Sequence, residues 1–244
     1  MAHKAKPLIG VLGGMGPLAT VDFMQRVIDL TPATCDQDHL ALLVANLPGT
    51  PDRSAAIIDG GPSPLPALLE GIDLLNRNAA ALIVVPCNSA HHWISEMRAH
   101  SAAPMLHIAE ACVAEVPADA RQVAVLATGG TMMSGFYQHS LRERGITPIE
   151  PNQAVQQHVS DCIREVKAGN IPASAEALSP AIRMLAEQGA QAVIMGCTEI
   201  PLAARPLSSF AARLGVPLID STLALARATV AFAHDRGWLL APAA

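Results

Sequence analysis

Short runs of consecutive apolar residues recur along the chain, separated by longer stretches in which apolar and polar residues mix. A run that is apolar at every position suits a strand with both faces covered, as in a parallel sheet. We therefore predict strands at Leu8–Leu12, Leu40–Ala45, Ala81–Val85, Met105–Ile108, Val123–Leu126, Ala192–Met195 and Pro217–Ile219.

The stretches between these runs repeat their apolar residues at helical spacing. In the last of them, Leu223, Ala226, Val230 and Ala233 recur three or four residues apart, which is the spacing of one buried helix face. The predicted helices are Ala19–Leu30, Leu65–Arg77, Ala90–His100, Gly135–Arg144, Ala154–Ala168, Ala175–Glu187 and Ser221–His234. Gly169 follows one of them where a helix is expected to end. Strands alternating with helices favour an α/β fold with mainly parallel sheets.

The second half of the chain resembles the first. Residues 78–88 align with 188–198, and residues 9–14 align with 123–128, in the same order. Any strand followed by a turn and a helix resembles another such unit to some extent. Two matches at similar offsets nevertheless favour duplication of one α/β unit.

The first alignment matches Cys87 with Cys197. We therefore expect two similar α/β lobes related by pseudo-symmetry. The first lobe is predicted to comprise residues 1–115 and 220–244 and to carry Cys87. The second is predicted to comprise residues 116–219 and to carry Cys197.

Each matched cysteine follows a predicted buried strand and precedes a predicted helix. Ligands of open α/β sheets bind beyond the carboxyl ends of the strands. Free backbone N–H groups at a helix start lower the pKa of a thiol and favour the reactive thiolate. The neighbours are small or polar, namely Asn88, Ser89, Thr198 and Glu199. A free cysteine is more often inert core, but two at matching places favour a site.

Two thiols that face each other across a cleft suit one reaction well. One, as thiolate, removes a proton from a carbon, and the other, as thiol, returns a proton to the opposite face. The product is the mirror-image centre, and a duplicated fold supplies the two similar groups. The remaining cysteines, Cys35, Cys112 and Cys162, suit a loop and helix cores and are predicted to be inert.

Composition excludes several classes of protein. The 244 residues are 51% hydrophobic, 15% charged and 3% aromatic, with a formal net charge of −5. This apolar content excludes a disordered chain. Nucleic-acid binding is not expected, because basic and stacking residues are scarce. The five cysteines form no Cys-x-x-Cys pair, so no zinc or redox framework is predicted.

The chain is predicted to act in the cytoplasm. No apolar run reaches the roughly 18 residues of a membrane-spanning helix. The first six residues, MAHKAK, lead directly into a short strand and glycines, unlike a signal peptide. Free thiols are then the default.

Several ordered stretches resemble the aspartate/glutamate racemase family, and within it the aspartate racemases. The similarity extends from about Ile9 to about Asp220. The stretches that carry it are Leu12–Thr20 (LGGMGPLAT), Pro86–His92 (PCNSAHH), Gly196–Glu199 (GCTE), Pro51–Arg53 (PDR) and Val166–Asn170 (VKAGN).

This resemblance implies a racemase that needs no PLP, metal or nucleotide and acts in the cleft between two α/β domains. The implied substrate is aspartate, with glutamate as an open addition. It implies that Cys87 and Cys197 are the two bases and that Arg53 and Lys167 meet the side-chain carboxylate of the substrate. It also implies that the α-carboxylate and amine are held by Met15, Asn88, Ser89 and Thr198. By resemblance alone, we expect the chain to form a homodimer and to bind a small-molecule amino-acid substrate.

Two positions depart from the family pattern. Ser89 stands where a threonine is usual, which keeps the hydroxyl group. Gly49 stands where a glutamine is usual, so an amide is lost and space is gained. This second departure leaves glutamate or another amino acid open as the substrate.

Other interpretations stay open at this point. Arg53 suits a solvated loop charge, and Lys167 suits a helix end, where a cation is favoured by the helix dipole. The glycines of Leu12–Thr20 match a dinucleotide fingerprint only weakly, because no acid ends the second strand, and they are expected to let the backbone approach a small substrate. His91 and His92 leave a Cys–His hydrolase as an alternative. The remaining alternatives are another isomerase of the family and a non-catalytic binding protein.

Overall fold

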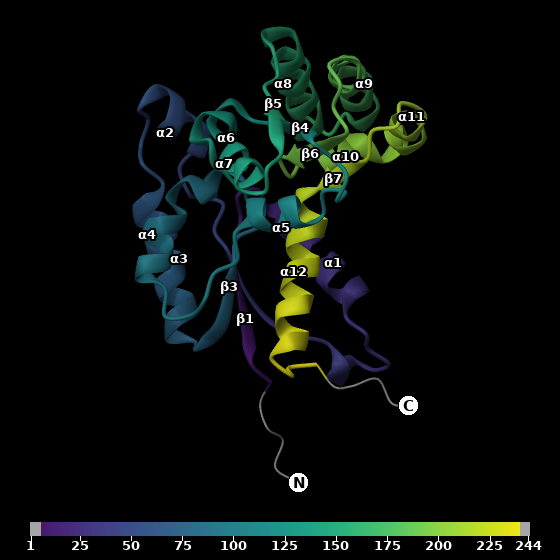
Figure 1. Cartoon of the computed structure of the whole chain (residues 1–244). Coiled ribbons are helices and arrows are strands. Elements are labelled where there is room, and N and C mark those ends of the chain that lie inside the picture. The colour runs from purple at the N-terminus through teal and green to yellow at the C-terminus, as the bar shows by residue number, and fades with distance from the viewer. Residues whose placement is uncertain (1–5, 240–244) are drawn as a thin grey trace. The chain divides into compact units, whose positions relative to one another are not determined.

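The structure is a computed structural model, which describes residues 6–239. Its elements, labelled in Figure 1, group into two compact units. The first unit comprises residues 6–52, 62–108 and 222–239, and the second comprises 53–61 and 109–221. The second unit thus takes in Arg53–Gly61 and residues 109–115, which the predicted lobes assign to the first. Most of the N-terminal segment judged above not to be a signal peptide lies outside the described residues.

The first unit is built on a parallel sheet with the strand order β2-β1-β3. Strand β1 is almost fully buried, as its uninterrupted apolar run predicts. The strands are β1 (Leu8–Gly13), β2 (Ala41–Asn46) and β3 (Ala80–Val84), and the helices are α1 (Pro17–Leu30), α3 (Leu65–Arg77), α4 (Ile94–His100) and, from Thr222 onward, α12 (Ser221–Asp235).

The second unit is built on a parallel sheet with the strand order β5-β4-β6-β7. The strands are β4 (Gln122–Ala127), β5 (Thr147–Ile149), β6 (Ala192–Gly196) and β7 (Leu218–Asp220). The helices are α2 (Arg53–Asp59), α5 (Ile108–Ala114, from Ala109 onward), α6 (Gly129–Ser134), α7 (Phe136–Glu143), α8 (Gln153–Lys167), α9 (Ile171–Glu187), α10 (Ile200–Ala204) and α11 (Ser208–Arg213). Helices α8 and α9 lie side by side (Figure 1) and pack with β4 and β6 in one apolar core.

The two sheets repeat one pattern of pairing. The sequence alignments match Gly10 with Ala124 and Ile83 with Val193. In the structure Gly10 pairs with Ile83 on neighbouring parallel strands, and Ala124 pairs with Val193 in the same way. Because aligned residues occupy the same register in both sheets, the structure confirms an α/β fold of two similar lobes and supports the duplication.

The predicted strand Met105–Ile108 is wrong. Met105 forms only an isolated parallel bridge to Ile83, and Ile108 already begins α5. The Met105 carbonyl accepts hydrogen bonds from the guanidinium of Arg98 at 3.1 and 3.3 Å. In a strand this oxygen would accept a hydrogen bond from the backbone of a neighbouring strand, but here it accepts from a side chain.

Other differences lie in short elements. Strand β5 was missed because Pro148 argues against a strand, yet β5 is an edge strand, where proline is tolerated. Gly135 does not begin a helix but separates α6 from α7 with φ of 71°. The predicted helix Ala90–His100 begins as a 3₁₀ helix over Ser89–Trp93. The helices α2, α5, α10 and α11 have seven residues or fewer, too short for a clear periodic signal.

The predicted helix end at Gly169 is confirmed. Gly169 has φ of 79°, and its N–H bonds the carbonyl of Val166. The next N–H, of Asn170, bonds the carbonyl of Glu165 at 2.9 Å, which completes a Schellman cap. Asn170 then caps α9 through its side chain, so that helix begins at Ile171, four residues earlier than predicted.

Within residues 6–239, no helix is both long and apolar enough to cross a membrane.

Candidate active site

The residues singled out by sequence lie mostly at one edge of each sheet. Because all strands of a sheet are parallel, the turns that follow β1 and β3 lie at the same edge. In the first unit this edge carries Met15 and, after β3, Cys87, Asn88 and Ser89. In the second unit Cys197 directly follows β6 at the corresponding edge, with Thr198 next.

The glycine-rich turn after β1 is shaped by contacts within the chain. Gly14 has φ of 92°, and a Cβ atom there would lie 2.3 Å from the backbone nitrogen of Leu47. The Gly14 N–H donates to the Thr20 hydroxyl at 2.9 Å, and a Cβ at Gly13 would lie 2.4 Å from the Thr20 side chain. Leu47 and Thr20 fill the space beside Gly14 and Gly13, which gives these two glycines a packing role within the chain, whereas nothing lies within 4 Å of an added Cβ at Gly16.

The turn after β3 holds the first cysteine. Cys87 is 4% exposed, and its Sγ lies 3.7 Å from the Ser89 hydroxyl. Its N–H bonds the Val85 carbonyl at 2.8 Å, which tightens the turn. Asn88, buried beside it, directly precedes the 3₁₀ helix that follows. A thiol with a hydroxyl neighbour is thus held at the carboxyl edge of the sheet.

His91 supports this turn from behind. Its Nδ1 lies 2.9 Å from the carbonyl oxygen of Cys87, and its ring centroid lies 4.9 Å from that of His107. Burial lowers the pKa of His91 to about 4 and that of His107 to about 3. A neutral imidazole bonded to the backbone suits a structural role better than the base of a Cys–His hydrolase. His92, the other candidate, is exposed.

This buried pair predicts sensitivity to acid. The folded state holds His107 neutral, whereas the unfolded chain protonates it near pH 6.5. The unfolded state therefore binds more protons than the folded state below about pH 6.5. As the pH is lowered, each of the two histidines then reduces the free energy of unfolding by up to about 1.4 kcal/mol per pH unit. We expect the free energy of unfolding of His107→Gln to depend less steeply on pH between about 6.5 and 4. Urea unfolding at a series of pH values measures this slope.

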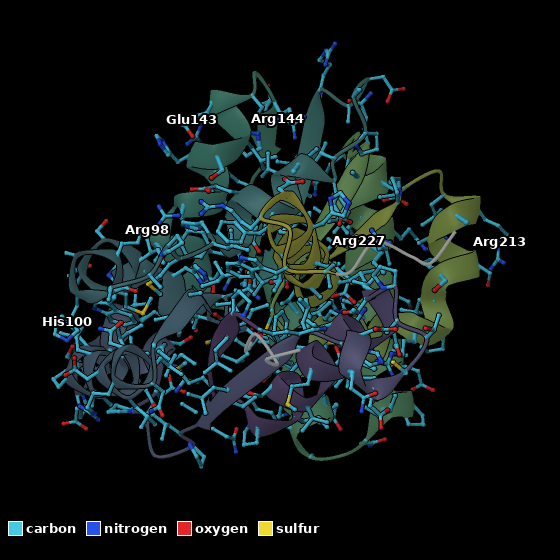
Figure 2. The ribbon with its side chains drawn as sticks, turned by 90° about the horizontal axis from the view of Figure 1, so that it is seen from below. Arg98, His100, Glu143, Arg144, Arg213 and Arg227 are labelled. Carbon is cyan, nitrogen blue, oxygen red and sulfur yellow. The ribbon has the colours of Figure 1, made fainter. Side chains whose placement is uncertain are left out.

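The control for this prediction is His100→Gln. His100 is exposed at the end of α4, where Figure 2 shows it at the outer side of the ribbon, and it pairs with Asp73. Its replacement should leave the slope near the wild-type value between pH 6.5 and 4. Equal slopes for wild type and His107→Gln would contradict the prediction.

The turn after β6 holds the second cysteine in a more polar setting. Cys197 is 6% exposed. Its Sγ donates to Oε2 of Glu199 at 3.0 Å, and the Thr198 hydroxyl donates to the same oxygen at 3.1 Å. Burial and the negative charge of Glu199 raise the pKa of Cys197 well above its ordinary value. This arrangement favours the protonated form of the Cys197 thiol.

Tyr137 lies under this turn, and sequence reasoning missed it. A Cβ at Gly196 would lie 3.0 Å from its ring, and its hydroxyl lies 3.4 Å from Sγ of Cys112. Cys112 and Cys162 are buried within α5 and α8, as predicted, and burial raises the pKa of both thiols to about 12. Tyr137 and Gly196 are 59 positions apart in the sequence, and no motif or periodicity connects them, so the sequence could not indicate this contact.

Arg53 belongs to the unit that carries Cys197. It begins α2, which packs against α6, so closely that a Cβ at Gly130 would lie 2.8 Å from Cα of Ser54. Helix α6 starts at Gly129, just after β4 ends. The half-buried guanidinium of Arg53 is therefore carried on a helix docked at the carboxyl edge of the second sheet.

Lys167 ends α8 as an exposed residue of the same unit. Its positive charge acts on Cys197, lowering the pKa of that thiol against the larger effects of burial and Glu199. Thus Arg53, Lys167, Cys197 and Thr198 share the second unit. Among residues 6–239, no group of three or more metal-ligating side chains lies together.

Comparison with known proteins gives one consistent result. Residues 12–229 match the family described as Asp/Glu/hydantoin racemase. The chain is 32% identical over 227 residues to the broad specificity amino-acid racemase RacX of Bacillus subtilis, covering 91% of this chain and 96% of RacX. The aspartate racemase of Picrophilus torridus superposes with a TM-score of 0.81 and is 30% identical, covering 93% of this chain and 94% of that one. A glutamate racemase from Aquifex pyrophilus, 20% identical with a TM-score of 0.60 and 92% and 83% coverage, shares the fold.

Proposed function

Since the chain belongs to the Asp/Glu/hydantoin racemase family, we propose that it interconverts L- and D-aspartate with Cys87 and Cys197 as its two bases. The resemblance deduced from sequence is confirmed, and the chain is an isomerase of the racemase type. The assignment of the two cysteines and of the substrate is our proposal.

One observation carries the choice of bases. Residues aligned by the internal repeat take the same sheet register, and each repeat carries a cysteine at the carboxyl edge of its sheet. The other buried cysteines, Cys112 and Cys162, lie within helices α5 and α8 and not in the turns that follow β3 and β6. Cys87 and Cys197 are therefore the matched pair that the two proton transfers require.

The proposed reaction transfers two protons. A thiolate removes the α-proton, and the electron pair left on the α-carbon is delocalised into the carboxylate group. The other thiol delivers its proton to the opposite face of the α-carbon. The two cysteines have then exchanged protonation states, so the reverse reaction uses the same groups in the opposite order. The proton removed from the α-carbon stays on one cysteine and the proton returned comes from the other, so the step balances and the proposal invokes no cofactor.

The remaining site residues are proposed to hold the substrate. Asn88, Ser89 and Thr198 offer amide and hydroxyl groups for the α-carboxylate and amine, and Met15 offers an apolar wall. Arg53 suits the distal carboxylate of aspartate, because its planar fork can bind a carboxylate with two hydrogen bonds. Lys167 adds a second positive charge in the same unit.

A wider range of amino acids is the second candidate. RacX is a broad specificity amino-acid racemase. At Gly49, where aspartate racemases usually have glutamine, no atom lies within 4 Å of an added Cβ. The absence of the glutamine side chain at this exposed position, four residues before Arg53, is the reason to include longer and uncharged amino acids, glutamate among them, as candidate substrates.

Deuterium incorporation tests the proposed reaction. We expect the enzyme in D₂O to place deuterium on the α-carbon of aspartate while the enantiomers equilibrate, because the returned proton comes from an exchangeable thiol. Mass spectrometry measures the incorporation, and chiral chromatography of a panel of L- and D-amino acids measures the range of substrates. A hydrolase or a binding protein incorporates no deuterium, and that result for every amino acid of the panel would refute the proposal.

Two further properties belong to the proposal. We place the enzyme in the cytoplasm, because all five of its cysteines are free thiols. We also propose a homodimer, which rests on the resemblance to aspartate racemases alone. Sedimentation equilibrium of the full chain distinguishes a dimer from a monomer.

A further inference from the structure

Glu199 stands at the start of a helix but does not cap it. It is the residue before α10, the position from which a short polar side chain such as Asp or Asn accepts a hydrogen bond from the first helical N–H groups. The structure has no such side-chain bond at this helix. The carboxylate instead accepts hydrogen bonds from Cys197 at 3.0 Å and Thr198 at 3.1 Å, both on Oε2. Its orientation therefore serves the thiol and not the helix.

On the basis of the function proposed above, we propose that Glu199 is a positioning residue that retains the proton on Cys197, so that Cys197 is the protonated member of the pair in the free enzyme. The hydrogen bond requires Cys197 to be the donor, because a carboxylate can only accept. If Cys197 lost its proton, two negative atoms would lie 3.0 Å apart.

The other groups near Cys197 do not reverse this preference. Lys167, from α8, favours the thiolate, but its effect is smaller than those of burial and Glu199. Tyr137, from α7, is neutral, since burial raises its pKa well above the ordinary value. Cys162, also from α8, is neutral because burial and Glu199 raise its pKa to about 12.

The two cysteines thus have different polar neighbours. The hydroxyl of Ser89, a neutral group, lies 3.7 Å from the sulfur of Cys87, whereas a carboxylate oxygen lies 3.0 Å from that of Cys197. The internal repeat aligns Glu199 with Ser89, since both stand two residues after their cysteine. The position two residues after the cysteine therefore differs in charge between the two lobes.

The test is the pH dependence of each thiol in the full-length protein. Wild type and Glu199→Gln are treated briefly with iodoacetamide across a pH series, and peptide mass spectrometry follows Cys197 and Cys87 separately. Glutamine keeps the size of the side chain but removes its charge and can donate to a thiolate. We expect the pH of half-maximal alkylation of Cys197 to fall by about one to three units, with the value for Cys87 unchanged. The alkaline limb of kcat/KM should move to lower pH in parallel.

Two variants serve as controls. Glu199→Asp keeps the carboxylate and should restore most of the wild-type profile of Cys197. Glu187→Gln removes an exposed charge of the same unit, at the end of α9, and should leave both profiles unchanged. Thiolate absorbance in the ultraviolet, taken as the difference from Cys197→Ser, gives the same midpoint without a reagent.

An unchanged Cys197 midpoint in a Glu199→Gln protein that melts like wild type would overturn the inference. So would equal shifts at both cysteines. If Glu199→Gln does not fold, a wild-type Cys197 midpoint below that of Cys87 in the same alkylation series would overturn it. Because these readouts need no substrate, they decide the role of Glu199 even if no amino acid of the panel is racemised, a result that would refute only the proposed function.

Discussion

Replacing Cys87 or Cys197 by serine is expected to lower the racemisation rate of aspartate by about 10²- to 10⁴-fold, the usual contribution of a general acid or base. Serine is close to cysteine in size, so the turns after β3 and β6 should keep their shape. It is a far weaker acid, however, and can neither give nor take the α-proton at neutral pH. Chiral chromatography of initial rates in both directions measures the loss, and circular dichroism checks the fold.

The single variants should also differ from each other. Each retains one thiol, which serves one face of the α-carbon, so each should still exchange the α-proton of one enantiomer with deuterium from the solvent. Cys112→Ser is the matched control, because Cys112 is a buried thiol that shares a hydrogen bond with the Tyr137 hydroxyl and takes no part in the proposed reaction. Near-wild-type racemisation by either Cys87→Ser or Cys197→Ser would end the two-base assignment.

Replacing Arg53 by alanine is expected to raise KM for aspartate by about ten- to a hundred-fold. A charge-assisted hydrogen bond contributes about 1.5–3 kcal/mol, which corresponds to that range in binding. Lys167→Ala should act in the same direction but less strongly, because Lys167 is exposed while Arg53 is half-buried. KM values for aspartate, glutamate and alanine, measured for wild type and both variants, separate loss of the distal carboxylate contact from general damage.

The appropriate control for these variants is Arg213→Ala. Arg213 is an exposed arginine of the same unit at the end of α11, and Figure 2 shows it at the periphery of the molecule. It should leave all KM values unchanged. A wild-type preference for alanine over aspartate that Arg53→Ala does not alter would refute the acidic substrate, while racemisation itself could stand.

The long elements and the two cysteines were predictable because their signals are local. A strand buried on both faces is apolar at nearly every position, so β1, β4 and β6 can be recognised in the sequence as short apolar runs. Helices α3 and α8 bury one face each and carry the matching periodicity. The offset between repeats matched Cys87 with Cys197, and parallel pairing then places each at the carboxyl edge of its sheet.

What the sequence by itself determined is therefore the fold class, the duplication, the candidate bases and, through its motifs, the family. Only the tertiary structure decided which unit carries Arg53, that His91 bonds the carbonyl of Cys87, and that Glu199 accepts from the thiol of Cys197. The reason is physical: periodicity reports which face of an element is buried, but a turn residue has no period. The direction of its side chain depends on which donors and acceptors the folded chain brings within hydrogen-bond distance, and burial then sets their charge.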